Sequence, residues 1–518
     1  MIAPRTTLYR AGSILSRGDG AAESMLVGEG RIRWLGPDSE ADRHVDGADE
    51  VVHLDGALVT PAFVDAHAHL SQTGAGMRGV DLSDVRSLAE ALGRIESAAR
   101  AVAGRAVFAP NWDETGWPER RPFTAAELDR ATYGGVVYAP RVDGHSAVVS
   151  SALAAAARIR DVDGRLPDGL VITDAHHQAR DTFASSVPPA QRRDDIAAAL
   201  RAASEAGIAV VHENGGPVVS SAEDFADVLD VARRPGLPDV VGYWAELAES
   251  AQAARELVRR HGAHGLAGDL SADGSIGSRT ASLRAPYADL PTDPDHCGNA
   301  YLSMAQVCRH LEACTAAGVQ GGFHVIGDRG VATVLEGMEA AAAVTGLDAF
   351  RRTGHRLEHV EMLGGGEVRR LARLGVMASV QPAFDAAWGG PAGMYAERLG
   401  VERVSGMNPF RTMLDAGLAL ALGSDSPVTP FAPWEAVRAC VRHHAHAERL
   451  SPTAAFRAHT VGGHRAAGAR GGELREGAEA TFVVWDRRGP GLPDLADGQP
   501  APQAVTTVLR GGVLHHAP

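Results

Sequence analysis

Lysine is absent from all 518 residues of this chain, so its 50 basic residues are all arginine. A coding bias that replaces surface lysine by arginine accounts for such a composition. The absence still matters for chemistry, because no site in this protein can use a lysine side chain.

Cysteine is scarce, and the four residues present (Cys297, Cys308, Cys314 and Cys440) include no Cys-x-x-Cys pair. That number gives no disulfide framework, so a reducing compartment is expected. The sequence also shows no signal peptide and no apolar run of the roughly 20 residues that a membrane span needs. We therefore expect a cytoplasmic protein that does not use a membrane as a partner.

Net positive charge is also lacking, since the formal charge at neutral pH is −14. A nucleic-acid-binding protein usually shows a basic patch, and we find none, which excludes nucleic acid as an expected partner. Hydrophobic residues make up 45% and charged residues 22% of the chain, which is typical of a soluble globular protein. At this length we expect one large domain and one smaller domain.

Both ends of the chain are rich in short β-strand patterns. Residues 24–36 predict a hairpin around Gly28-Glu29-Gly30, and residues 480–485 and 504–509 resume the pattern near the C-terminus. Neither end is long enough for a domain of its own. We therefore predict one small β-sandwich domain built from residues 1–60 and 466–518.

The middle of the chain, residues 61–465, alternates apolar strands with alanine-rich helices. This alternation predicts a parallel sheet, and eight or more such units predict an α/β fold of the (β/α)₈ TIM-barrel type. The strand candidates slightly exceed eight, so some belong to an insertion. Residues 110–200, rich in Pro, Trp and Arg, are the predicted insertion.

Polar residues recur where the predicted barrel strands end. His67 and His69 follow the first apolar strand, and on a strand residues two apart point the same way, so both imidazoles can bind one metal ion. His324, His359 and Asp425 follow later strands. Because barrel active sites form at these strand ends, the five residues predict a metal site with a carboxylate that can take a proton.

The chain resembles the amidohydrolase superfamily, specifically its YtcJ-like branch (amidohydrolase family 3). The matching segments span nearly the whole chain and are residues 63–69 (FVDAHAH), 272–281 (ADGSIGSRTA), 324–329 (HVIGDR), 356–359 (RLEH), 381–382 (QP) and 423–427 (GSDSP). The resemblance implies a metal-dependent hydrolase barrel in which His67, His69, His324 and His359 are metal ligands. It also implies that Asp425 is a ligand or near-ligand and the general base.

One position departs from the family pattern. The family often holds two metals bridged by a carboxylated lysine, and Asp269 occupies that lysine's place here. An aspartate has a much shorter stem, and bridging two ions would require the strand to move inward. We therefore expect a single divalent ion, zinc first, with Asp269 either a direct ligand or hydrogen-bonded to one; Glu213, at another strand end, is the alternative carboxylate.

Weaker signals extend the candidate site. His145 lies in an Arg-x-x-Gly-His segment that resembles the same family, and it is predicted to donate a hydrogen bond to the substrate carbonyl. Trp112, Arg279 and Gln381 form the predicted substrate-binding group, although Trp112 as core and Arg279 in an internal ion pair remain open. His443 and His446 lie in a predicted helix, Trp434 to Glu448, and are expected on its solvated surface.

These features predict a hydrolase that cleaves a non-peptide C–N bond of a small molecule, with an N-acyl or N-formyl amine or a cyclic amide as substrate. Deamination of a heterocycle by the same site is the enzymatic alternative. A catalytically silent homologue that binds a metal or ligand is the alternative from another class. A homodimer is usual for similar proteins, but the residues themselves do not predict one.

Overall fold

The computed structural model describes residues 6–16, 22–102, 106–496 and 498–517. Its centre is an eight-stranded sheet in which every neighbouring pair of strands is parallel. In sheet order the strands are β7 (Phe63–Ala68), β12 (Ile208–Gly215), β13 (Asp239–Trp244), β14 (Gly265–Leu266), β15 (Gln320–Val325), β16 (Arg356–His359), β17 (Met377–Val380) and β18 (Ala419–Leu422). The predicted (β/α)₈ fold class is confirmed.

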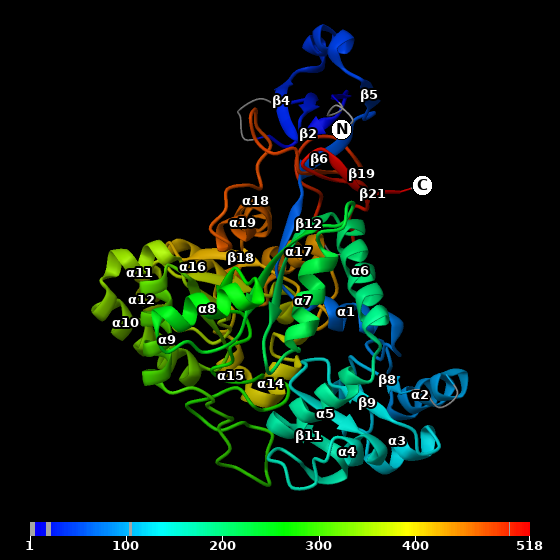
Figure 1. Ribbon diagram of the computed structural model, residues 1–518, viewed down its shortest axis with the longest axis vertical. Coiled ribbons are helices and arrows are strands. Elements are labelled where there is room, and N and C mark those ends of the chain that lie inside the picture. Colours follow the sequence, from blue (N-terminus) through cyan, green and yellow to red (C-terminus); the bar gives the residue numbers. More distant parts are fainter. Residues whose placement is uncertain (1–5, 17–21, 103–105, 497, 518) are drawn as a thin grey trace.

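Helices surround this sheet (Figure 1). They are α1 (Leu70–Arg78), α6 (Pro189–Glu205), α7 (Ala222–Val231), α8 (Ala251–His261), α9 (Met304–Ala317), α10 (Asp328–Thr345), α11 (Leu347–Thr353), α12 (Gly365–Leu374), α13 (Pro382–Trp388), α14 (Met394–Leu399), α15 (Val401–Val404), α16 (Phe410–Asp415), α17 (Pro433–Arg442), α18 (Pro452–Arg457) and α19 (Gly463–Ala466).

The local sequence explains where these helices begin and end. Helix α9 starts with a capping box, in which Ser303 and Gln306 each bond the other's backbone N–H, and it ends at Gly318 in the left-handed conformation. Its inward face buries Val307, Leu311 and Cys314. Helix α17 is shorter than predicted: it ends at Arg442, because His443 leaves the helical conformation.

Backbone hydrogen bonds join the first and last barrel strands beyond their ends. The Asp425 N–H donates to the His67 carbonyl at 2.7 Å, and the His69 N–H donates to the Ser426 carbonyl at 2.8 Å. The buried carboxylate of Asp65 accepts from the Ser424 N–H at 3.0 Å. This seam holds Asp425 beside the two histidines of the first strand.

Two further sheets combine strands from both ends of the chain. One contains β1 (Thr7–Arg10), β3 (Ser24–Gly28), β4 (Arg31–Gly36) and β5 (Glu50–His53); the other contains β2 (Ser13–Ile14), β6 (Ala57–Pro61), β19 (Phe482–Arg488), β20 (Ala504–Leu509) and β21 (Gly512–His516). A shared apolar core that includes Tyr9, Met25 and Phe482 lies between them. This is the predicted sandwich, and Figure 1 shows strands from the N-terminal and C-terminal parts of the chain side by side in it.

The insertion is a separate four-stranded sheet with its own helices, located at the other end of the molecule from the sandwich (Figure 1). Its elements are α2 (Leu88–Val102), β8 (Val107–Phe108), α3 (Ala125–Ala131), β9 (Val137–Pro140), β10 (Ser146–Val149), α4 (Ser151–Ala156), β11 (Leu170–Ile172) and α5 (Thr173–Ser185). Its apolar core already includes Leu82 and Leu88. The inserted unit therefore begins earlier than residue 110 and ends before α6, which packs on α1.

Among the described residues, none of the helices combines the length and the apolar character that crossing a bilayer requires.

Candidate metal and active site

Four histidines from three barrel strands surround a common point at the carboxyl ends of those strands. His67 lies on β7 and His69 directly after it, His324 lies on β15, and His359 ends β16. Each is buried, with at most 7% of its surface exposed. The alternation of β7 turns His67 inward, and the first turn of α1 begins directly after His69.

Asp269 lies at the centre of these four imidazoles. Its Oδ1 is 3.3 Å from His67 Nε2, 3.6 Å from His324 Nδ1 and 3.9 Å from His359 Nε2. Its Oδ2 is 3.2 Å from His69 Nε2. The structure therefore places the Asp269 carboxylate among all the predicted ligands.

The short aspartate stem reaches this position because the backbone leaves the barrel strand early. Strand β14 ends at Leu266, and Gly268 then adopts a left-handed φ of +79°. A β-carbon at Gly268 would lie 2.4 Å from Asn214 Oδ1, so this close approach requires glycine. Gly268 thus lets the backbone just before Asp269 pass close to Asn214.

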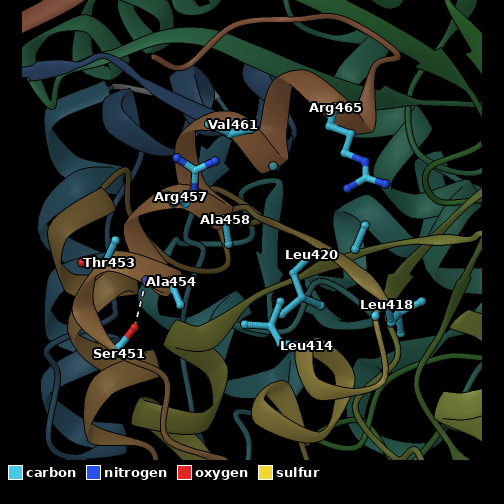
Figure 2. A pocket seen from close by; sticks show the side chains of 13 residues that line it. Leu414, Leu418, Leu420, Ser451, Thr453, Ala454, Arg457, Ala458, Val461 and Arg465 are labelled. Carbon is cyan, nitrogen blue, oxygen red and sulfur yellow. Dashed lines mark hydrogen bonds between the residues drawn. The ribbon is translucent and has the colours of Figure 1, made fainter. Parts of the chain in front are cut away.

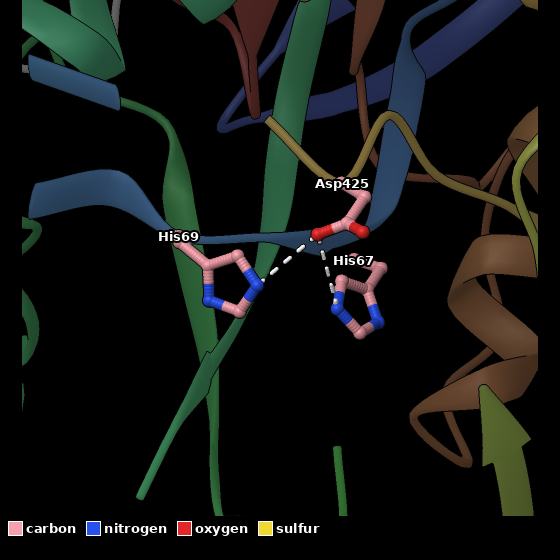
Figure 3. Close-up of side chains that lie close together, drawn as sticks. All are labelled: His67, His69 and Asp425. Atoms are coloured by element: carbon pink, nitrogen blue, oxygen red, sulfur yellow. Dashed lines mark ion pairs between the residues drawn. The ribbon is translucent and has the colours of Figure 1, made fainter. Parts of the chain in front are cut away.

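Asp425 completes the cluster from the loop after β18. Its Oδ1 is 3.1 Å from His69 Nε2 and 3.5 Å from His67 Nε2, as Figure 3 shows. The backbone of Asp425 has φ +56°, and that of His359 has φ +68°. Non-glycine residues rarely adopt this region, and such strain is typical of functional sites.

Each histidine forms a hydrogen bond through the ring nitrogen that does not face the cluster. His67 Nδ1 bonds Glu358 Oε2 at 2.9 Å, His69 Nδ1 bonds the Asn214 carbonyl at 3.0 Å, His324 Nε2 bonds the Gly274 carbonyl at 3.3 Å and His359 Nδ1 bonds Gln381 Oε1 at 2.7 Å. A ring nitrogen that donates to such an acceptor leaves the other nitrogen with its lone pair directed at the cluster. This is the arrangement of metal-binding histidines in proteins.

The carboxylate behind His67 belongs to a charged layer inside the barrel. Arg356 Nε donates to Glu358 Oε1 at 2.6 Å, and both side chains are fully buried. Arg356 also donates to the Ala66 carbonyl at 2.7 Å and stacks over the Tyr243 ring at 4.3 Å. Burial opposes the charge of Glu358, but Arg356 and His67 hold its pKa near 2, so it remains an acceptor for His67.

The electrostatics of the cluster favour a cation at its centre. Burial disfavours a charged His67, yet the carboxylates of Asp269 and Asp425 raise its pKa to about 10. The same carboxylates raise the pKa of His69, and burial again opposes them. His67 Nε2 and Asp269 Oδ1 are buried and have no hydrogen-bond partner among the described residues. The buried Asp425 and the partly buried Asp269 thus favour positive charge on the rings, and a divalent metal bound by these carboxylates and neutral imidazoles can take the place of the ring protons.

Glu213, the alternative carboxylate, binds a backbone N–H group instead. It is 3% exposed, and its Oε2 accepts the Leu70 N–H at 2.7 Å. Burial raises its pKa to about 7. The groups of described residues that are close enough to hold an ion are His67, His69 and Asp425, and His67, Asp269 and His359. Glu213 belongs to neither, so the geometry favours Asp269.

His145 approaches the cluster from the insertion. It lies in the turn between β9 and β10, and its ring centroid is 5.1 Å from that of His324. Burial lowers the pKa of His145 to about 4, so the ring is neutral at neutral pH. Its ring nitrogens have no hydrogen-bond partner within the described part of the chain, which leaves them free for a ligand.

The three predicted substrate-binding residues are all engaged within the protein. Trp112 is 1% exposed, its indole N–H donates to the Ala139 carbonyl at 2.8 Å, and its ring packs in the insertion core, which is the alternative that the sequence left open. Arg279 forms an ion pair with Asp289 at 2.6 Å, which is the alternative that the sequence left open. Gln381 orients His359, and its buried Nε2 has no partner among the described residues.

His443 also differs from the expectation. It is 2% exposed rather than solvated, and its Nε2 is 3.5 Å from the buried carboxylate of Asp385. The helix ends just before it, which lets the ring turn into the protein.

A cavity of about 550 Å³ lies elsewhere, at the opposite end of β18 from Asp425 (Figure 2). It is lined by apolar side chains such as Leu414, Leu418 and Leu420, with Arg457 and Arg465 among them. Barrel active sites form at the other ends of the strands, so this cavity is not part of the candidate site.

Sequence reasoning missed the groups that hold the ligands in place. Glu358 and Asp65 are fully buried carboxylates on strands, and Asn214 binds His69 through its backbone. Charged residues two apart within an otherwise apolar strand, such as Arg356 and Glu358, are the signal that could have identified the first of these. A backbone acceptor such as the Asn214 carbonyl leaves no such signal.

A (β/α)₈ barrel with histidines and carboxylates gathered at its strand ends is the arrangement of a metal-dependent hydrolase. Residues 50–515 match the model of the Amidohydro_3 family, described as an amidohydrolase family. That range is most of the chain, and the protein belongs to this family.

The chain is also similar to three proteins of known sequence. The chain is 28% identical to Protein LONG AFTER FAR-RED 3 of Arabidopsis thaliana (90% of this chain and 85% of the relative covered). It is 25% identical to the Putative amidohydrolase YtcJ of Bacillus subtilis (85% and 84% covered) and 25% identical to N-substituted formamide deformylase of Arthrobacter pascens (96% and 95% covered). The resemblance to the YtcJ-like branch is confirmed.

A solved structure shares the fold. The crystal structure of an uncharacterized metal-dependent hydrolase from Pyrococcus furiosus superposes with a TM-score of 0.70 at 24% identity, covering 93% of this chain and 99% of the other.

Proposed function

We propose that this protein is a metal-dependent amidohydrolase that cleaves a non-peptide C–N bond in a small molecule. An N-formyl or N-acyl amine is the first choice of substrate, and a cyclic amide the second. The relative named as an N-substituted formamide deformylase supports the first choice, because the match covers nearly all of both chains.

The observation that carries this proposal is the convergence of lone pairs on one point. Nitrogen and oxygen ligands lie 2.0–2.2 Å from zinc, so two ligand atoms of a tetrahedral site are roughly 3.4 Å apart. The distances from Asp269 Oδ1 to His67 Nε2 and from Asp425 Oδ1 to His67 Nε2 are 3.3 and 3.5 Å. The residues present therefore fit a divalent ion, for which zinc suits the imidazole and carboxylate donors.

We propose one ion rather than two. The two groups that can hold an ion share His67, whose Nε2 has a single lone pair. Two ions therefore cannot occupy the two groups at the same time. Asp269 acts as a ligand of the same ion and replaces the family lysine as the central carboxylate.

When bound, a divalent ion lowers the pKa of a water molecule from about 15.7 toward ~7 and polarises a carbonyl group. The protein's own groups do the rest. Asp425 Oδ2 takes the proton of the attacking water and returns it to the leaving nitrogen. The neutral ring of His145 donates a hydrogen bond to the substrate carbonyl oxygen.

Product analysis tests the reaction class. The protein, purified without chelator and then loaded with zinc, is incubated with a panel of N-formyl amines, N-acyl amines, cyclic amides and amino-substituted heterocycles. Formate or another carboxylate together with an amine supports the proposal. Release of ammonia from the heterocycles alone assigns the deaminase alternative, and no turnover across the panel assigns the silent binding homologue; either result overturns the proposal.

A further inference from the structure

Two loops from distant parts of the chain meet beside His145. Residues 141–146 include the turn between β9 and β10 of the insertion, and residues 275–278 belong to the connection between β14 and α9 of the barrel. Asp143 Oδ2 accepts hydrogen bonds from the hydroxyls of Ser275 and Ser278, each at 2.8 Å. The Ser278 hydroxyl also lies 2.8 Å from that of Ser146, which follows His145.

The lack of a side chain at Gly277 leaves room for two charged groups where these loops touch. A β-carbon at Gly277 would lie 2.4 Å from Arg141 Nη1 and 2.5 Å from Asp143 Oδ2. Those separations are far below van der Waals contact. Gly277 therefore lets the barrel loop lie against Arg141 and Asp143, whose own separation is 3.2 Å.

Buried ion pairs also hold the two loops together. Arg141 pairs with Glu114 at 2.9 Å, and Arg398 of the barrel pairs with the other oxygen of Glu114 at 2.7 Å. Arg398 Nε also donates to the Gly277 carbonyl at 3.2 Å. Both arginines are at most 4% exposed. Removing one partner from such a buried network leaves an unpaired charge, so the two loops are held as one unit.

His145 belongs to the turn that these contacts hold in place. The backbone N–H of His145 donates to Asp143 Oδ1 at 3.4 Å. The His145 ring faces the His324 ring and has no hydrogen-bond partner among the described residues. Nothing else within the described residues fixes the ring by hydrogen bonding. The orientation of His145 thus depends on where Asp143 holds the turn.

We propose that Asp143 is a positioning residue, clamped by Ser275 and Ser278, that aims the His145 ring at the substrate carbonyl. This inference rests on the proposed function for the role of His145. It assigns a purpose to the two serines of the 272–281 motif: they join the insertion to the barrel at the point where His145 enters the site. A misplacement of about 1 Å at such a point costs on the order of 100-fold in rate.

A double-mutant cycle tests the proposal. Asp143→Asn in the zinc-loaded enzyme is expected to lower kcat by roughly 10–100-fold with KM and zinc content unchanged. In the His145→Ala background the same substitution is expected to have no further effect, because it acts through His145. Losses that multiply in the double variant, or an unchanged kcat in Asp143→Asn, would overturn the proposal.

A second set of variants covers the case in which Asp143→Asn does not fold. Ser278→Ala keeps the Arg141–Asp143 ion pair and removes one clamp, and Ser97→Ala, whose hydroxyl bonds only within α2, is the matched control. The readout is the NMR signal of the His145 ring, assigned by its loss in His145→Ala. A shifted or broadened signal in Ser278→Ala but not in Ser97→Ala supports the proposal, and identical signals contradict it. This readout needs no turnover, so it stands even where the amide panel disproves the proposed function.

Discussion

Glu358 Oε2 accepts a hydrogen bond from His67 Nδ1 at 2.9 Å inside the barrel, where both residues are fully buried. This contact fixes the tautomer of His67, so that Nε2 carries the lone pair that faces Asp269 and Asp425. Arg356 in turn holds Glu358. The orientation of the first candidate ligand is therefore set by a strand on the other side of the barrel.

Weakening this contact should weaken metal binding. Glu358→Gln keeps the shape of the side chain but removes the charge that favours the N–H on His67 Nδ1. We expect zinc affinity to fall by about 10–100-fold, as is usual for loss of such an outer partner. Competition with a chelator measures the affinity. Glu339→Gln, which alters a half-buried ion pair with Arg370 on the helices outside the barrel, is the control, and equal affinities in both variants would contradict the account.

Proton transfer should depend on Asp425. Asp425→Asn keeps an oxygen near His67 and His69 but cannot take a proton, so we expect zinc to be retained and kcat to fall by about 100-fold or more. Asp415→Asn, at an exposed position, should leave both unchanged. Zinc content and steady-state kinetics are measured on the same preparations. Comparable activity in Asp425→Asn removes Asp425 from this role.

Metal uptake should not require carbon dioxide. A lysine must first react with carbon dioxide to present a carboxylate, whereas Asp269 carries its own, and the chain contains no lysine. We expect equal zinc binding in carbon-dioxide-free buffer and in buffer with added bicarbonate. Asp269→Ala should lose more affinity than Glu358→Gln, because it removes a ligand rather than its support. A rise in zinc binding on adding bicarbonate, or normal affinity in Asp269→Ala, would refute this role.

Trp112 should contribute to the stability of the insertion and not to zinc binding. Removing its buried ring leaves a cavity beside Trp117 and Phe123, so Trp112→Ala should destabilise the insertion by about 3–5 kcal/mol. Urea unfolding followed by tryptophan fluorescence measures the loss, and zinc content should not change. Tyr133→Ala is the control, since Tyr133 is 69% exposed. A variant as stable as the control would show that the ring is not part of a packed core.

The barrel and the strand-end positions of its candidate ligands were predictable because they depend on local patterns. Alternating strands and helices predict the parallel sheet, and polar residues at strand ends predict that His67, His69 and Asp425 lie close together, as they do in the structure. The place of His145 among the candidate site residues came only from the family resemblance, because an insertion can return to the barrel from many directions.

Other features depend on tertiary contacts that no local pattern records. Trp112 follows a strand just as His145 does, but the insertion has its own core and buries the ring there. Arg279 meets Asp289 ten residues later, and His443 turns inward because α17 ends early. The reach of Asp269 depends on the backbone of Gly268, whose left-handed conformation cannot be inferred from a single glycine.

Diffraction at the zinc absorption edge, on crystals of the zinc-loaded protein, tests the central claim most directly. The account predicts one anomalous peak in the barrel, about 2.0–2.2 Å from His67 Nε2 and from carboxylate oxygens of Asp269 and Asp425. Two peaks of equal height would contradict the single-ion site, and the absence of a peak between these side chains would contradict the metal site itself.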